Sequence, residues 1–270
     1  MLSYTAQQAS GVSCWMRDEE HIEKAFDFGG MPARNGTSAA AMVAHGFTAV
    51  EDVFAGERNF FIAYGRKPDL GELTRGLGTA YEVMNTNIKR WSVGSPIQAP
   101  LDSLLELIRE HGVTAGDVEK CVIRVSVSGG NTVNNRDMPD ICMQQMCAVM
   151  LLDGIVTFES AHDELRMRDA KVLAMRRRIE LIGDEELERL MPERHGIAEI
   201  TLKDGRRFRH HTKAVRGTAQ NPMTRAEVDE KCYHLMAPVL GKTRARKLCD
   251  TVWKIERVKD VRALRPLLQA

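Results

Sequence analysis

The spacing of apolar residues predicts helices in the first third of the chain. Residues 6–16 are small and apolar, and residues 37–46 form an alanine-rich segment that ends at a glycine, a residue that commonly terminates helices. Residues 70–85 also have helical spacing, although they include three glycines, which weaken a helix. We therefore expect a mainly helical region at the start of the chain.

The pattern changes after residues 91–100, which are rich in Ser, Gly, Pro and Gln and mark a candidate domain boundary. Residues 101–111 carry Leu and Ile at helical spacing and precede Gly112, so they predict a helix. Residues 120–128 alternate as a strand does, and residues 137–152 predict another helix. Four methionines near helical spacing are expected in the core: Met138, Met143, Met146 and Met150.

The clearest local signal is a β-hairpin at residues 196–215. Two alternating runs flank Asp204 and Gly205, a pair that tolerates the positive φ angles of a tight turn. Thr224 and Glu227 have the spacing of a capping box and predict the start of a helix. Further helices are predicted at residues 242–253 and 260–268. Helices, then a mixed middle, then helices again predict an α+β fold with two structural regions.

Composition and charge narrow the class of protein. The 270 residues include 38 basic and 37 acidic side chains, so no global field attracts nucleic acid or an anionic membrane. The longest apolar run, at residues 147–152, is far below the roughly 20 residues of a membrane-spanning helix. Six scattered cysteines, no CxxC pair and no signal peptide indicate reduced thiols. We expect a cytoplasmic protein with no nucleic-acid or membrane partner.

Two motif-like patterns do not satisfy the requirements of their motifs. Gly241-Lys242-Thr243 resembles the end of a phosphate-binding loop, but Met236 stands where that loop needs a glycine. His210 and His211 are adjacent on a predicted strand, so their side chains point to opposite faces and cannot both ligate one ion. We therefore predict no metal site.

The most unusual segment spans residues 21–56. Lys24 and Arg34 place positive charge on either side of Gly29 and Gly30, and a small-residue helix follows. Paired glycines allow a close approach of the backbone to another group. Two interpretations stay open: a loop that holds a carboxylate-bearing ligand, and a purely structural glycine turn.

Four segments occur in an order that points to a known family. They are KAFDFGGMPARNGTSAAAMVAHGFT at 24–48, IKRW at 88–91, AVMLLDGIVTFESAHDE at 148–164, and the LKDGRRF hairpin with GTAQNPMTRAEVDEKCYHLM at 217–236. Together they resemble the MmgE/PrpD family, which includes 2-methylcitrate dehydratase, cis-aconitate decarboxylase and iminodisuccinate epimerase. Any one segment is weakly specific, but the ordered set spans nearly the whole chain.

The resemblance implies a cofactor-independent enzyme with a discontinuous all-helical domain and a smaller α+β lid domain that contains an antiparallel sheet. It places the first part of the helical domain at residues 1–93, the lid at 94–217, and the returning C-terminal helices at 218–270. Family substrates are small di- or tricarboxylates such as 2-methylcitrate. The implied reaction is a dehydration (a lyase reaction) or an isomerisation at a carbon next to a carboxylate, where lysine ammonium groups stabilise the developing enediolate.

The resemblance also implies site residues. Lys24 and Lys89 match the two family lysines and are expected to bind carboxylates and stabilise charge during catalysis. Asp27 and Arg34 are expected to line the substrate site, although Asp27 stands where relatives often have histidine. Gly94 stands where some relatives have a second histidine, which argues against a decarboxylase-type reaction.

Relatives carry a long helical stretch before the Lys24 segment, and that stretch supplies acid–base residues. The chain therefore resembles the C-terminal portion of a family member: a truncated product, a separately encoded half or a degenerate copy. One hypothesis is an enzyme that works with a complementing N-terminal chain. The other is a non-catalytic remnant or carboxylate-binding subunit. Incomplete helical packing predicts an oligomer, and the resemblance implies a homodimer.

Overall fold

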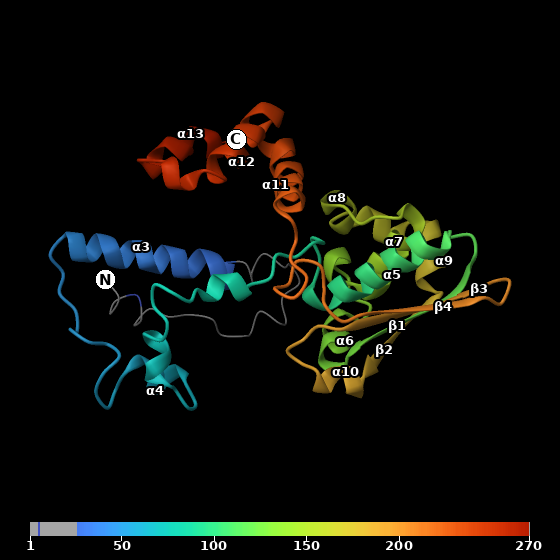
Figure 1. The fold of residues 1–270 in the computed structure, drawn as a ribbon, viewed down its shortest axis with the longest axis horizontal. Helices are drawn as coiled ribbons and strands as arrows, with labels where there is room; N and C mark the ends of the chain where they lie inside the picture. The colour runs from blue at the N-terminus through green and yellow to red at the C-terminus, as the bar shows by residue number, and fades with distance from the viewer. Residues whose placement is uncertain (1–4, 6–25, 270) are drawn as a thin grey trace. The chain divides into compact units, whose positions relative to one another are not determined.

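The computed structural model describes Thr5 and residues 26–269 of the chain. The predicted helix at residues 6–16 and the candidate site residue Lys24 lie outside the described residues. The chain divides into two compact units, Met1–Tyr81 and Glu82–Ala270, whose elements are labelled in Figure 1. The predicted domain ranges 1–93, 94–217 and 218–270 stay predictions.

The described part of the first unit contains one 14-residue helix and several shorter ones, with few buried side chains. The π-helix η2 (Phe26–Gly30) leads into α3 (Met31–Ala44), which has a proline in its first turn. The helix predicted for residues 37–46 is confirmed, with an earlier start, and Gly46 follows it at a φ of +89°. α3 buries Asn35 and Ala39. The short helix α4 (Phe60–Tyr64) is capped by the Asn59 side chain, which accepts a hydrogen bond from the Ile62 N–H.

The helix predicted for residues 70–85 is wrong. Two short 3-10 helices form instead, η3 (Leu70–Leu73) and η4 (Glu82–Asn85). Gly76 and Gly78 lie between them at φ angles of +66° and +80°. These angles are incompatible with a right-handed helix, so the glycines outweigh the helical spacing of the apolar residues.

The described part of the second unit contains a four-stranded mixed sheet. Its strands are β1 (Val118–Ser126), β2 (Ile179–Asp184), β3 (Gly196–Leu202) and β4 (Arg207–Thr212), in the spatial order β2-β1-β3-β4. β1 pairs with β3, and β3 with β4, in antiparallel fashion, whereas β2 pairs with β1 in parallel. The predicted α+β fold is confirmed, but the prediction of an antiparallel sheet is wrong at β2. The chain returns from β1 to β2 through several helices, the long crossover that parallel pairing requires.

Helices cover both faces of this sheet. α5 (Gln98–His111) packs on β3 and β4, α7 (Met143–Asp153) on β2, and α9 (Ala170–Arg176) on α7, whereas α6 (Val127–Val133) and α10 (Glu185–Arg189) lie on the other side (Figure 1). Shorter elements connect them: η5 (Ser95–Ile97), η6 (Pro139–Ile141), α8 (Phe158–Ala161) and η7 (Leu165–Arg168). The helix predicted at residues 101–111 is confirmed as α5, and the one predicted at 137–152 is confirmed as α7 with a later start.

The hydrophobic core lies between the sheet and the helices α5 and α7. Its fully buried side chains include Leu101, Leu104, Ile123 and Ile200. Three of the four methionines expected in the core are buried there: Met143, Met146 and Met150. Met138 is only partly buried. α7 begins at Met143 because Pro139 and its neighbours first form η6.

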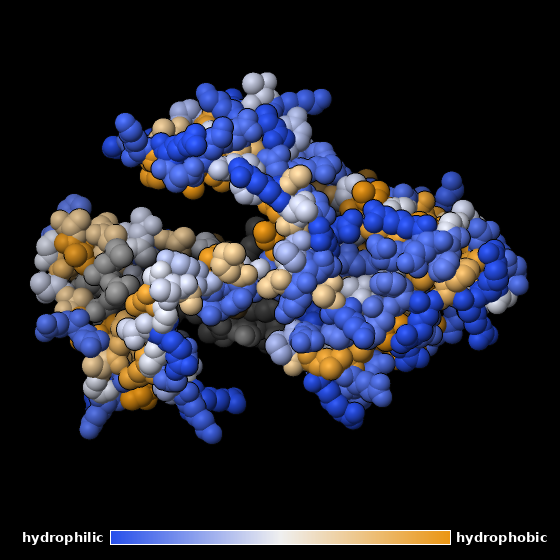
Figure 2. Space-filling model, in the orientation of Figure 1, coloured by the Kyte–Doolittle hydropathy of each residue, from blue (hydrophilic) through white to orange (hydrophobic). Residues whose placement is uncertain are grey.

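The predicted hairpin is confirmed as β3 and β4. Gly205 has a φ of +87°, and the Leu202 N–H donates to the Arg206 carbonyl across the turn at 2.9 Å. The strand register pairs Ile200 with Phe208 and Glu199 with Arg209. The surface over this hairpin is mainly hydrophilic (Figure 2). The local Asp-Gly signal was therefore sufficient to place both strands.

The chain ends in a group of helices: α11 (Arg225–Leu240), α12 (Lys242–Val252), η8 (Ile255–Arg257), η9 (Val261–Leu264) and α13 (Arg265–Leu268). The predicted capping box is confirmed. The Thr224 hydroxyl accepts from the Glu227 N–H at 3.2 Å, and the Glu227 carboxylate accepts from the Thr224 N–H at 2.7 Å. Neither these helices nor any other among residues 26–269 is long and apolar enough to cross a membrane.

Candidate functional site

The segment that carries Lys89 is held in place by a buried glutamine. The Gln98 side chain accepts from the Trp91 N–H at 3.1 Å and donates to the carbonyls of Trp91 and Val93 at 2.8 and 3.2 Å. On the other side, the Ile88 N–H donates to the Gly217 carbonyl at 2.8 Å. A Cβ on Gly217 would lie 1.8 Å from the Ile88 carbonyl oxygen, so this approach requires glycine. The backbone around Lys89 is therefore fixed from two directions.

Lys89 lines a cavity of about 210 Å³, which we call the lysine cavity. Two more cations, Arg194 and Arg216, line it, and no carboxylate side chain is among its described lining residues. The neutral polar lining comes from four side chains: Asn87, Ser95, Gln98 and Thr218. The Lys89 ammonium donates to the Val93 carbonyl at 3.1 Å. Basic side chains therefore outnumber acidic ones among the described lining residues of this cavity.

Arg216 is the most constrained of the three cations. Its guanidinium donates to both Glu227 carboxylate oxygens, at 3.2 and 2.5 Å, and to the Asn221 side-chain oxygen at 2.8 Å. The hydrogen bond from Arg216, with those from Thr224, lowers the pKa of Glu227 to about 2. Because these contacts use three of its five N–H donors and pair its charge with Glu227, Arg216 shapes the wall of the lysine cavity more than it attracts a ligand.

Asp102 of α5 connects two segments that line the lysine cavity. This buried carboxylate accepts from the Trp91 indole N–H and from the Arg216 backbone N–H, both at 2.9 Å. The Arg90 guanidinium lies 3.7 Å away. Burial raises the pKa of Asp102 despite these contacts. Asp102 thus ties the lysine segment and the residue 216 turn to one helix.

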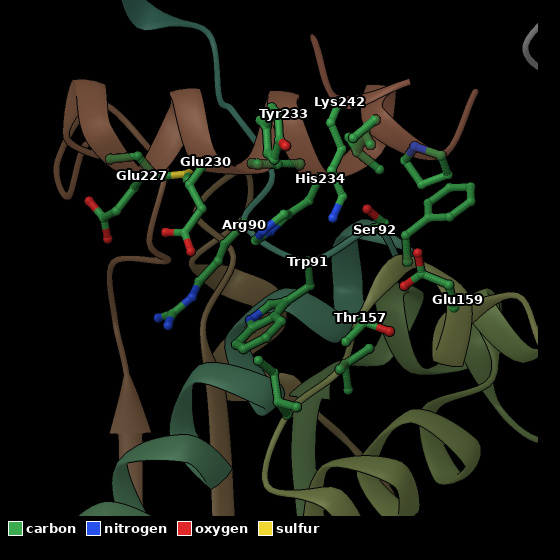
Figure 3. Close-up of a pocket in the computed structure, with 18 residues that line it drawn as sticks. Arg90, Trp91, Ser92, Thr157, Glu159, Glu227, Glu230, Tyr233, His234 and Lys242 are labelled. Atoms are coloured by element: carbon green, nitrogen blue, oxygen red, sulfur yellow. The ribbon is translucent and has the colours of Figure 1, made fainter. Parts of the chain in front are cut away.

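A larger groove lies beside the lysine segment (Figure 3). This Trp91 groove has a volume of about 820 Å³ and runs between α11 and residues 155–159. Figure 3 shows His234 and Lys242 pointing into it above the indole of Trp91, with Glu159 at one end. The Arg90 guanidinium stacks 4.6 Å from the Trp91 ring centroid. The groove therefore combines an aromatic floor with side chains of both charges.

α11 reaches from this groove back to the lysine segment. The Lys231 ammonium donates a hydrogen bond to the Lys89 carbonyl. Burial lowers the pKa of Lys231. Through Lys231 and Glu227, α11 contacts both the Lys89 backbone and Arg216. Helix α11 thus contributes to the frame of the lysine cavity.

Comparison with known proteins identifies the family. The family model described as the MmgE/PrpD C-terminal domain matches residues 91–256, which include the sheet, α5–α12 and all described lining residues of the Trp91 groove except Arg90. The chain belongs to the MmgE/PrpD family. This is a family of dehydratase- and lyase-like enzymes. No curated protein matches the chain.

The range matched by the MmgE/PrpD model does not include the predicted site residues. Lys89 lies just before the matched range, whereas Arg194 and Arg216 lie within it. Lys24 is outside the described residues. Asp27 lies in η2 and Arg34 in α3, where the Arg34 guanidinium donates to the Asn35 side-chain oxygen at 3.1 Å. Both belong to the first unit and Lys89 to the second, so a site that combines them stays a prediction.

Sequence reasoning missed the other lysine-cavity residues of this MmgE/PrpD domain. Arg194 follows the β2–α10 region and carries no motif of its own. Arg216 immediately precedes the segment at 217–236 that resembles the family. This position is the one feature of the sequence that could have indicated Arg216 as a site residue. Glu227 was predicted for its capping role, but its pairing with Arg216 was not.

Proposed function

We propose that this chain binds a small di- or tricarboxylate, such as 2-methylcitrate, in the lysine cavity, and takes part in a lyase or isomerase reaction. The reaction would occur at a carbon next to a substrate carboxylate and, as the family resemblance implies, without a cofactor. The observation that carries the proposal is that Lys89 and Arg194 line one cavity, whose wall includes the Glu227-paired Arg216 and whose described lining has no carboxylate.

The chemistry assigned to Lys89 is electrostatic. Removal of a proton next to a carboxylate moves negative charge onto the carboxylate oxygens, and an ammonium group fixed beside them stabilises that charge. The Val93 carbonyl accepts from Lys89 at 3.1 Å and helps to orient the ammonium. Gln98 holds that carbonyl in turn, so the position of the charge depends on buried hydrogen bonds.

Arg194 is the second ligand-binding residue in this proposal. Arg194 is exposed and lines the lysine cavity, whereas the charge of Arg216 is paired with Glu227. A dicarboxylate would therefore place one carboxylate at Lys89 and another toward Arg194. A planar guanidinium suits this task because it donates two parallel hydrogen bonds to a carboxylate.

Carboxylate binding without turnover is the second candidate function. The composition of the lysine cavity favours this second function. A histidine or carboxylic acid could protonate a leaving hydroxyl group, but neither is among the described lining residues. Enzymatic turnover requires such a group from elsewhere. The two functions predict the same binding but differ in product formation.

The test measures binding and turnover separately. Citrate and 2-methylcitrate are titrated calorimetrically, and formation of the conjugated double bond is followed by absorbance. Lys89→Ala should weaken binding about ten- to a hundredfold, since a hydrogen bond to a charged group contributes about 1.5–3 kcal/mol, whereas Lys89→Arg should retain much of it. Lys203→Ala, which removes an exposed lysine from the β3–β4 turn, is the matched control. Equal behaviour of Lys89→Ala and Lys203→Ala, or no binding of either acid, would refute the proposal.

A further inference from the structure

β4 forms one edge of the sheet and leaves part of its backbone unpaired. Across the hairpin turn, the Leu202 N–H donates to the Arg206 carbonyl. In an antiparallel pair, hydrogen-bonded and non-hydrogen-bonded residues alternate. The β3–β4 register then directs the backbone N–H and C=O groups of Arg207, Arg209 and His211 away from β3. No turn, loop or side-chain hydrogen bond of the described chain uses these groups. They form a template for one more strand.

The side chains along this edge carry a concentrated positive charge. Residues 206–213 read RRFRHHTK. Arg207 and Arg209 share one face of the strand and are both exposed. Arg207 makes no ion pair within the described residues, and Arg209 lies 3.5 Å from Glu199, a carboxylate that Arg124 also approaches at 3.4 Å. The edge therefore has more positive charge than its acidic neighbours compensate.

The opposite face of β4 is less polar. Phe208 is half-buried, and its ring stacks on His111 of α5 with the centroids 4.0 Å apart. A strand laid against β4 would thus meet arginines on one face and an aromatic pair on the other. Side chains of a strand alternate between faces, so a complementary strand has acidic and apolar residues in alternation.

We propose that the β4 edge binds an extended segment of a partner protein in which acidic and apolar residues alternate. The backbone of that segment would pair with Arg207, Arg209 and His211, and its carboxylates would contact the two arginines. A second copy of this chain does not fit, because pairing β4 with itself would set arginines against arginines, and like charges directly opposite destabilise a sheet. Charged side chains of either sign would keep an edge strand from pairing with other chains. The charged side chains of β4 are all basic, so this edge favours an acidic partner.

The test uses a fluorescein-labelled, end-capped octapeptide of alternating Glu and Val, with binding followed by fluorescence polarisation. Two control peptides separate strand addition from simple attraction. One has the same composition with all glutamates in one block, and the other carries N-methyl groups on the residues whose amides face β4. We expect the alternating peptide to bind most tightly and the N-methylated peptide to lose binding, because it cannot form the inter-strand hydrogen bonds.

Two double variants test the location of binding. Arg207→Glu/Arg209→Glu should weaken binding about tenfold or more, since two exposed ion pairs are replaced by repulsion. Arg168→Glu/Arg177→Glu makes the same change in net charge at exposed positions outside β4 and should have little effect. Hydrogen exchange should slow at the Arg207 and Arg209 amides when the alternating peptide binds. Equal binding of the block peptide, equal weakening by both double variants, or no slowing of exchange would overturn the proposal.

Discussion

Helices α7 and α11 belong to the same unit but depend on different forces. Nine of the 11 residues of α7 are buried, whereas none of the 16 residues of α11 is. α7 has an unbroken apolar stretch that packs against α5, α9 and β2. α11 is maintained by its capping box and by ion pairs such as Arg216–Glu227 and Arg246–Asp229, both with N–O distances near 2.6 Å.

Because the two helices are stabilised differently, mutations and changes of solvent should affect them differently. Burial of apolar side chains involves no titrating group, so the stability of α7 depends on side-chain volume and on unsatisfied polar groups. Capping by a carboxylate and ion pairing depend on protonation and ionic strength, so the stability of α11 should depend on pH and salt. Because α11 holds Arg216 and the Lys89 backbone, the frame of the lysine cavity shares this sensitivity. Mutations that act on one helix and not on the other test the comparison directly.

The largest effect is expected from truncating a core side chain of α7. Met146 is fully buried, so Met146→Ala should lower the free energy of unfolding by about 2–5 kcal/mol through lost burial and a cavity. Val239→Ala in α11 is the control, because Val239 is largely exposed and should change stability by about 0.5 kcal/mol or less. Urea unfolding followed by circular dichroism measures both. Similar losses in the two variants would contradict the contrast between the helices.

A smaller effect of opposite sign is expected at a buried amide of α7. The Gln145 side chain is fully buried, and neither its Nε2 nor its Oε1 has a hydrogen-bond partner in the described structure. Gln145→Met removes this desolvated amide at similar volume and should raise the free energy of unfolding by about 1–2 kcal/mol. The same urea titration measures the change.

Gln144 is the matched control for that substitution. Its side chain accepts from the Asn135 N–H at 2.9 Å and donates to the Asn134 side-chain oxygen at 2.8 Å. Gln144→Met should therefore destabilise the protein, because it removes both hydrogen bonds and leaves the Asn135 N–H without its acceptor. If both substitutions destabilise equally, the two amides do not differ as the structure indicates.

The same contrast explains which features could be predicted from the sequence. The hairpin turn at Asp204 and the cap at Thr224 depend on residues close together in the chain, and both predictions were confirmed. β2 escaped prediction because its pairing with β1 spans several helices. The helix predicted for residues 70–85 failed because periodicity does not show that Gly76 and Gly78 adopt positive φ angles.

The candidate site was predictable only in part for the same reason. Lys89 was proposed from a local motif, and it lines a cavity rich in positive charge. Its neighbours come from distant parts of the chain: Arg194 precedes β3, Arg216 follows β4, and Lys231 is 142 residues away in α11. Such proximity is a property of the tertiary fold, and no spacing along the sequence encodes it.

The smallest expected effect is a pH dependence specific to the α11 cap. The pKa of Glu227 is lowered from 4.5 to about 2 by Arg216 and Thr224. A lowered carboxyl pKa stabilises the folded state above the unfolded pKa, and this contribution is lost as pH falls through the folded pKa. Glu227→Gln should therefore lower the melting temperature near neutral pH, and the gap from the unsubstituted protein should narrow between pH values of about 4.5 and 2.

Thermal melts across that pH range, followed by circular dichroism, measure the gap. Glu230→Gln is the control, because it removes a carboxylate from the same helix without breaking the Arg216 pair or the cap. The solvent-exposed side of the Arg216–Glu227 pair screens its attraction, so the expected shift is smaller than that of either α7 substitution. A pH-independent gap for Glu227→Gln would mean that α11 does not depend on this ionised carboxylate, and that its packing against α12 holds it instead.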